Sequence, residues 1–202
     1  MQSNTASFTT RGRPREFDID DALDKAMDVF RSQGFHATSI AELSKAMNLT
    51  VGSIYKAFGD KPNLFSQVFN RYLLLRQEEL NLCISKANSG YEKIESLLNF
   101  YINSVKDMEG KKGCLVVGSA IEIEILNQEL TRAVEFALNQ NLSRIKKFII
   151  EGKGDGTINP NIDIDQAASL LLCLVLGIRV AGKVSSTNPN NSIASLIMKL
   201  FN

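Results

Sequence analysis

The chain has 202 residues, of which 44% are apolar and 22% are charged, and its formal net charge is +1. This length is enough to bury one large or two small domains, and the composition excludes a disordered chain. A charge so close to zero also excludes a globally cationic surface, so any affinity for nucleic acid has to come from local clusters of Lys and Arg.

Apolar residues recur at helical spacing, only four prolines interrupt them, and no segment alternates as a strand does. We therefore expect an all-α fold of about nine helices. The longest apolar run, 167–178, is shorter than the roughly 20 residues that cross a bilayer, and it predicts a fully buried helix and no membrane partner.

The three cysteines, Cys83, Cys114 and Cys173, lack the paired spacing of a zinc site or a disulfide framework. This pattern is typical of the reducing cytoplasm. The Ser/Thr-rich segment 1–10 has no apolar core of a secretory signal, so we expect a cytoplasmic protein.

The first helical pattern covers 18–34. Either Thr38 or Ser39 can cap a second, short helix, and Asn48, which tolerates a left-handed backbone, ends that helix in a tight turn. Thr50 then caps a third short helix. Two short helices joined by so tight a turn predict a helix-turn-helix, a unit that reads DNA.

Longer helical patterns fill the rest of the chain. Asp60 can cap a fourth helix that reaches about residue 86, with Pro62 in its first turn. Charged or Gly-rich loops are predicted at 109–113 and 152–161. The remaining helices are expected at 91–108, 114–126, 128–151, 163–183 and 191–201.

Three motifs resemble the TetR/AcrR family of bacterial repressors: 12–18 (GRPREFD), 38–40 (TSI) and 47–61 (MNLTVGSIYKAFGDK). The resemblance is strong over 11–72 and weak beyond. It implies a homodimeric repressor that binds an inverted-repeat operator and is released by a small-molecule or redox signal. Two positions depart from the family pattern, because Asn48 replaces the usual Gly of the turn and Val51 replaces a residue that is commonly polar or basic.

The third helix has the chemistry of a major-groove helix, since the residues off its core face are small or cationic. Lys56 and the Tyr55 hydroxyl are assigned to phosphates, and Thr50, Val51 and Ser53 to the groove floor, where a methyl can meet a thymine. The alternative for Tyr55 is a core aromatic. The residues of this segment predicted to contact DNA are Thr50, Val51, Gly52, Ser53, Tyr55 and Lys56.

Further DNA contacts are predicted outside this helix. Thr38, at the amino end of the second helix, and Lys61 are assigned to phosphates. Arg11 and Arg13, with Arg15, precede the first helix and can reach the minor groove or the neighbouring backbone, the alternative being a solvated tail.

The resemblance divides the chain into a flexible basic arm (1–15), a helix-turn-helix domain (16–60) and a ligand-binding and dimerisation domain (61–202). The last two helices resemble the pair that forms the family's dimeric four-helix bundle. We expect a small apolar or amphipathic effector between the fourth and eighth helices, although aromatic residues there can equally be packed core. The residues predicted to line its cavity are Phe69, Tyr72, Tyr101, Cys114 and Phe136.

Cys114 follows Gly113 at a helix start, where amide groups can lower a thiol pKa. Redox sensing at Cys114 and a buried structural role both remain open, whereas Cys83 and Cys173 are interpreted as core. The single histidine, His36, has no partner for a metal site, and no nucleophile dyad or Gly-rich phosphate loop is present, so we expect neither an enzyme nor a cofactor. The alternative function is an architectural DNA-binding protein without an effector.

Overall fold

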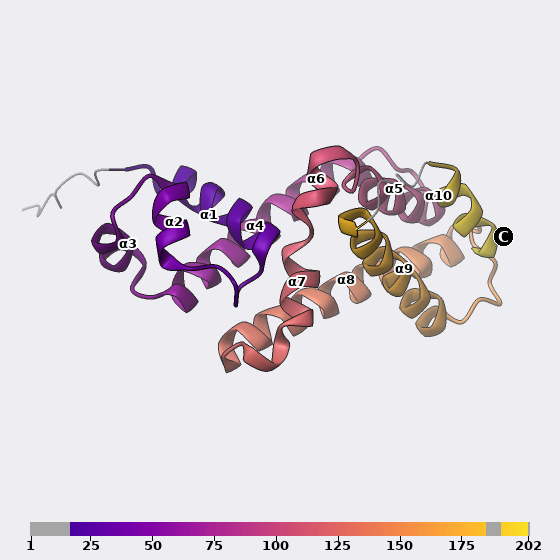
Figure 1. Cartoon of the computed structure of the whole chain (residues 1–202). Helices are drawn as coiled ribbons and strands as arrows, with labels where there is room; N and C mark the ends of the chain where they lie inside the picture. The colour runs from indigo at the N-terminus through magenta and orange to yellow at the C-terminus, as the bar shows by residue number, and fades with distance from the viewer. Residues whose placement is uncertain (1–16, 185–190, 202) are drawn as a thin grey trace, which may run out of the picture.

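The computed structural model describes residues 17–184 and 191–201, so the predicted arm with Arg11 and Arg13 lies outside the described residues. Within the described residues the chain forms ten α-helices and two short 3-10 helices, without any strand (Figure 1). The expected all-α fold is therefore confirmed. Figure 1 places α3 at one end of the molecule and α10 near the other.

The helices begin and end close to the predicted residues in most cases. Their bounds are α1 (Ile19–Gln33), α2 (Ile40–Met47), α3 (Val51–Phe58), α4 (Lys61–Ile84), α5 (Gly90–Asn103), α6 (Asp107–Lys112), α7 (Leu115–Ile121), η1 (Ile123–Ile125), α8 (Gln128–Gly154), α9 (Ile164–Val184), α10 (Asn191–Met198) and η2 (Lys199–Phe201).

The loop predicted at 109–113 was wrong, because α6 occupies most of it. Acidic residues in the first turn of α6 and lysines in the last favour a helix through its dipole. The glycine that suggested a loop has a packing reason instead: a β-carbon on Gly110 would lie 2.0 Å from the carbonyl oxygen of Val105.

Local capping interactions shape the helix-turn-helix as the sequence predicts. Ser39, rather than Thr38, caps α2 and forms a capping box with Glu42. Asn48 adopts the left-handed conformation with φ 54° and ψ 42°, and the Thr50 side chain then caps α3. The turn between α2 and α3 is thus determined by residues within a few positions of it.

Two hydrophobic cores hold the helices together. The first contains Phe30, Phe65 and Phe69 of the N-terminal helices, and it continues into Leu115 of α7 and Leu130 of α8. The second lies among α4, α5, α8, α9 and α10. Because the first core crosses the expected boundary at residue 60, α1 to α3 are packed against the C-terminal helices rather than tethered to them.

The prediction that the apolar run 167–178 forms a fully buried helix was wrong. The run belongs to α9, which buries one face and exposes the other, including Leu170, Cys173 and Val180. Cys83 is exposed as well. Ser169 is the one polar residue of the run, so the run shows no clear periodicity and the sequence did not indicate which face of the helix is buried.

By length and hydropathy alone, α9 would be able to cross a membrane, and it is the one such helix in the described part of the chain. Core helices of soluble proteins pass the same test.

We expect Asn48→Ala to lower the free energy of unfolding by about 1 kcal/mol, because alanine is strained at a positive φ and has no side-chain amide to compensate. Asn48→Gly should cost little, since glycine adopts this conformation freely. Urea unfolding followed by circular dichroism measures both. An equal loss of unfolding free energy in the two variants would show that Asn48 does not stabilise the turn through its left-handed backbone conformation.

Candidate functional site

The α3 helix has one buried face and one open face. Ile54 and Phe58 are buried in the first core. On the opposite face Val51, Tyr55 and Lys56 are exposed, and Tyr55 keeps 49% of its surface accessible. Tyr55 is therefore not a core aromatic, and α3 presents small, aromatic and cationic side chains to the outside.

The hydroxyl groups of Thr50 and Ser53 are engaged within the helix end. The Thr50 oxygen accepts a hydrogen bond from the Ser53 amide at 3.1 Å and lies 2.9 Å from the Ser53 hydroxyl. Gly52 beside them is exposed, and a β-carbon there would meet only the Thr50 hydroxyl, at 3.9 Å. Packing within the chain thus leaves room for a larger residue at position 52.

Thr38 and Lys61, for which we predict phosphate contacts, both make hydrogen bonds within the chain. Thr38 is 1% exposed and its hydroxyl donates to the Gly34 carbonyl at 2.6 Å. Lys61 donates to the Thr38 carbonyl at 2.6 Å and its ammonium lies 4.6 Å from the centre of the Phe35 ring. Burial lowers the Lys61 pKa despite nearby carboxylates. Both residues hold the turn between α1 and α2.

A carboxylate from the C-terminal part of the chain binds the same turn. The amides of Phe35 and His36 donate to Glu122 at 2.7 and 3.3 Å. Glu122 follows directly after α7, so this contact couples the end of α7 to the start of the helix-turn-helix. Sequence reasoning missed it because Phe35 and Glu122 are 87 positions apart.

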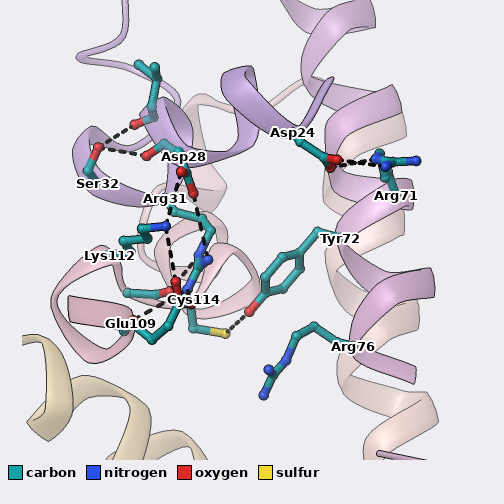
Figure 2. Close-up of polar contacts among 12 residues, drawn as sticks. Asp24, Asp28, Arg31, Ser32, Arg71, Tyr72, Arg76, Glu109, Lys112 and Cys114 are labelled. Carbon is teal, nitrogen blue, oxygen red and sulfur yellow. Dashed lines mark hydrogen bonds and ion pairs between the residues drawn. The ribbon is translucent and has the colours of Figure 1, made fainter. Parts of the chain in front are cut away.

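The carboxyl end of α1 is attached to α6 and to the residues that follow it. Arg31 donates to the Gly113 carbonyl at 3.0 Å and pairs with Glu109 at 3.0 Å. Lys112 pairs with Asp28 at 3.1 Å, and Figure 2 shows these groups gathered beside α1. The helix that precedes the helix-turn-helix is thus bonded to the segment that leads to Cys114.

A cavity with a free volume of about 70 Å³ lies next to this segment, among α4, α5, α7, α8 and α9. Three residues predicted to line a cavity, Tyr72, Tyr101 and Cys114, line this one. Phe69 does not, because it is buried in the first core. Phe136 does not line it either, because its side chain is 60% exposed. The next residue, Ala137, faces the cavity, so the prediction for Phe136 was wrong by one residue along α8.

Arg179 of α9 is the buried cation of this cavity, with 3% of its surface exposed. It donates to the carbonyl and hydroxyl of Ser104 at 2.8 and 2.6 Å. It also donates to the Gly113 carbonyl at 3.3 Å and to the Tyr72 hydroxyl at 3.4 Å. Gly113 therefore accepts from Arg31 on one side and from Arg179 on the other. Arg179 was not predicted from the sequence, although it and Lys183 are the two cations of the otherwise apolar helix α9.

The Cys114 sulfur lies 3.4 Å from the Tyr72 hydroxyl, which can donate to it (Figure 2). Burial raises the pKa of the Cys114 thiol, but the Arg179 guanidinium and the Tyr72 hydroxyl stabilise the thiolate, and the net result is a lowered pKa. Burial raises the pKa of Tyr72. The cavity thus favours negative charge on sulfur rather than on the phenol.

Two family models match the chain. The model described as "Bacterial regulatory proteins, tetR family" matches residues 22–68, and the model described as "Tetracyclin repressor-like, C-terminal domain" matches residues 90–192. Together they cover the helix-turn-helix and the cavity helices α5, α7, α8 and α9, whereas the α4 residues that line the cavity lie between the two matches.

Curated relatives and solved structures agree with these models. The HTH-type transcriptional repressor ComR of Escherichia coli (strain K12) is 26% identical over 181 residues, which is 86% of this chain and 83% of the relative. The repressor BdcR of the same strain is 42% identical over 62 residues, or 31% of this chain and 32% of the relative. A cysteine-substituted TetR family regulator CifR, solved with a 26-base-pair operator, matches with TM-score 0.80 and 26% identity over 94% of this chain and all of that one.

We expect the pKa of the Cys114 thiol in the folded protein to lie below its ordinary value of 9.0. A Cys83→Ser/Cys173→Ser variant isolates this thiol, and its ultraviolet thiolate absorbance can be titrated against pH in the folded and the guanidinium-unfolded protein. Since the folded-state pKa is the lower one, the thiolate adds stability that is fully present above pH 9.0 and is lost as the pH falls through the folded-state pKa. Identical titration curves in the two states would contradict this electrostatic environment.

Proposed function

Because the chain belongs to the TetR family of bacterial DNA-binding transcriptional regulators, we propose that it is a homodimeric repressor that binds an inverted-repeat operator through α3 and is released when a small molecule occupies the cavity beside Cys114. The family is one of regulators rather than enzymes, as expected. The single observation that carries the DNA-binding part of the proposal is the open face of α3, which is small, cationic and uncovered.

The open face of α3 suits the floor of a major groove. The Val51 methyls can contact a thymine methyl, and Lys56 and the Tyr55 hydroxyl can bind phosphate oxygens. Gly52 supports this orientation, because a glycine inside a helix costs roughly 0.5–1 kcal/mol and packing within the chain leaves room for a side chain there. Close approach of a duplex explains why a side chain is absent at this position.

The exposed faces of α9 and α10 support a homodimer. On α9, Leu170, Cys173, Gly177 and Val184 are exposed at alternating spacings of three, four and seven, and they form one apolar stripe. Leu196 of α10 is exposed too. Apolar helix faces of this kind bury themselves against a partner, and two such pairs make a four-helix bundle. A twofold axis would then present two α3 helices about 34 Å apart, one turn of B-DNA.

The Gly113 carbonyl links the cavity wall to the helices that are proposed to bind DNA. It accepts hydrogen bonds from Arg179 in the cavity wall and from Arg31 at the end of α1. A ligand that moves Arg179 changes the position of this carbonyl and hence of α1, to which α2 and α3 are packed. Each 1.4 kcal/mol by which the ligand prefers the displaced state weakens DNA binding about tenfold.

Oxidation of Cys114 is a second candidate signal, favoured by the contact of its sulfur with the Tyr72 hydroxyl at 3.4 Å and by the neighbouring Arg179, which helps to lower the thiol pKa. Oxidised Cys114 would disturb the same Tyr72 and Arg179 contacts as a ligand.

The operator can be identified by selecting bound duplexes from a random pool with the purified dimer. We expect a single inverted repeat to dominate the selected sequences. Dispersed sites of low affinity would instead favour an architectural protein without an effector.

On the selected duplex, Lys56→Ala should weaken binding and reduce the slope of log affinity against log salt by about two, one phosphate contact for each subunit. Fluorescence anisotropy at several salt concentrations measures both quantities. Lys86→Ala, an exposed lysine beyond the end of α4, serves as the matched control and should leave the slope unchanged. Equal slopes for all three proteins would remove Lys56 from the interface.

We expect Leu196→Glu to convert the dimer to a monomer, since a carboxylate in the bundle would be buried without a partner. DNA affinity should then fall at least about tenfold, because two half-sites no longer bind as one unit. Sedimentation velocity and anisotropy measure the two effects. Leu82→Glu on α4 carries the same change on an exposed leucine outside this face, and should leave the dimer intact. A dimeric Leu196→Glu protein would exclude α10 from the interface.

A further inference from the structure

We propose that the cavity beside Cys114 binds the carboxylate of a small organic acid, which accepts hydrogen bonds from Arg179 and Arg76 while its short apolar part lies against the aliphatic wall. This inference rests on the proposed function, because it names the chemical class of the effector for the same cavity.

Positive charge collects in the cavity, and in the described part of the chain only Arg76 of its three arginines pairs with a carboxylate, that of Glu79. Arg76, Arg144 and Arg179 all line it, and its lining residues include no Asp or Glu. Arg179 is the most buried of the three, and in the described part of the chain its guanidinium pairs with no carboxylate: it donates to Ser104, Gly113 and Tyr72, and it stabilises the Cys114 thiolate. Burying a charge without a carboxylate partner costs free energy. An anion that enters the cavity is therefore attracted by a guanidinium charge that no carboxylate of the protein offsets.

Two of these guanidinium groups also carry unused donors. Arg179 Nε and Arg76 Nη2 are buried, and neither has a hydrogen-bond partner within residues 17–184 and 191–201. Buried donors without an acceptor are rare in folded proteins, and those that occur call for an explanation. Guanidinium N–H groups match the geometry of a carboxylate, and such charge-assisted hydrogen bonds are about twice as strong as neutral ones.

Arg76 is held in position before any ligand arrives. Its Nη1 pairs with Glu79 at 2.8 Å and its guanidinium carbon lies 4.2 Å from the centre of the Phe100 ring. Figure 2 shows Arg76 one turn along α4 from Tyr72, on the side of the Tyr72–Cys114 contact. Little side-chain entropy therefore remains to be lost when Arg76 binds an anion.

The three arginines act on a common region of the cavity. Burial and the nearby Cys114 raise the pKa of Tyr101, while Arg76, Arg144 and Arg179 each act to lower it. All three charges are thus close enough to influence one phenol, and their combined field favours a negative group there.

The size and the wall of the cavity limit the acid. A free volume of about 70 Å³ compares with the roughly 10–15 Å³ that one water needs on this measure, so the cavity admits a few carbon atoms rather than a long chain. Leu73, Val116 and Val175 supply apolar surface beside the arginines. A short-chain acid offers a carboxylate to the arginines and an alkyl group to this apolar surface.

The test is isothermal titration calorimetry of the dimer with acetate, propionate and butyrate against acetamide, propionamide and butyramide, at constant ionic strength set with NaCl. We expect the acids to bind and the amides of the same shape not to bind. Arg76→Gln should weaken acid binding at least about tenfold. Arg132→Gln, an exposed arginine of α8 outside the cavity, should bind the acids unchanged.

Two further measurements keep the test independent of folding defects. Arg144→Gln removes the third charge without touching the Arg179 contacts, and should also weaken acid binding. In the Cys83→Ser/Cys173→Ser variant, a bound carboxylate should raise the Cys114 pKa, because its negative charge offsets the positive charge of Arg179 that stabilises the thiolate. Amides that bind as tightly as acids, acid affinities unchanged in both arginine variants, or binding of inorganic phosphate but of no carboxylate would each overturn the proposal.

The operator assay separates this inference from the proposed function. Acids that bind in the cavity but leave DNA affinity unchanged would disprove release by the cavity and leave the carboxylate site standing. Tight operator binding that neutral compounds release, together with no calorimetric binding of the acids, would disprove the carboxylate site and leave the repressor standing.

Discussion

The carbonyl oxygen of Gly113 is the acceptor on which the coupling between the two ends of the molecule depends. Arg31 donates to it from α1 at 3.0 Å, and Arg179 donates to it from α9 at 3.3 Å. A carbonyl oxygen has two lone pairs, and here both are directed to cationic donors from distant parts of the chain. Only glycine suits the position, because φ is +83° and a β-carbon would lie 2.9 Å from the Lys183 side chain.

In the proposed mechanism, the packing around Gly113 lets the helix-turn-helix respond to a ligand in the cavity. The first core runs from α1 to α4 into α7 and α8 without a break, and Glu122 fastens the turn after α1. Because a rigid connection of this kind has few ways to move, the proposed ligand would displace α1 together with Arg179.

The overall net charge of +1 conceals a strong local separation of charge. Near α1, cations and carboxylates neutralise each other, as Arg31 does with Glu109 and Lys112 with Asp28. In the cavity Arg76 pairs with Glu79, but Arg144 and Arg179 pair with no carboxylate in the described part of the chain. The same residue type therefore has two roles: near α1 it joins structural elements, and in the cavity it leaves a charge for which a ligand can compensate.

The sequence by itself determined the features that depend on near neighbours along the chain. The Ser39–Glu42 capping box, the left-handed turn at Asn48 and the Thr50 cap act within a few residues, so the helix-turn-helix and its open face could be predicted. Only the tertiary structure decided the interior of the cavity and its connection to α1. Arg179 meets Tyr72 across 107 positions and Glu122 meets Phe35 across 87, and no periodicity along the chain encodes which distant polar groups meet.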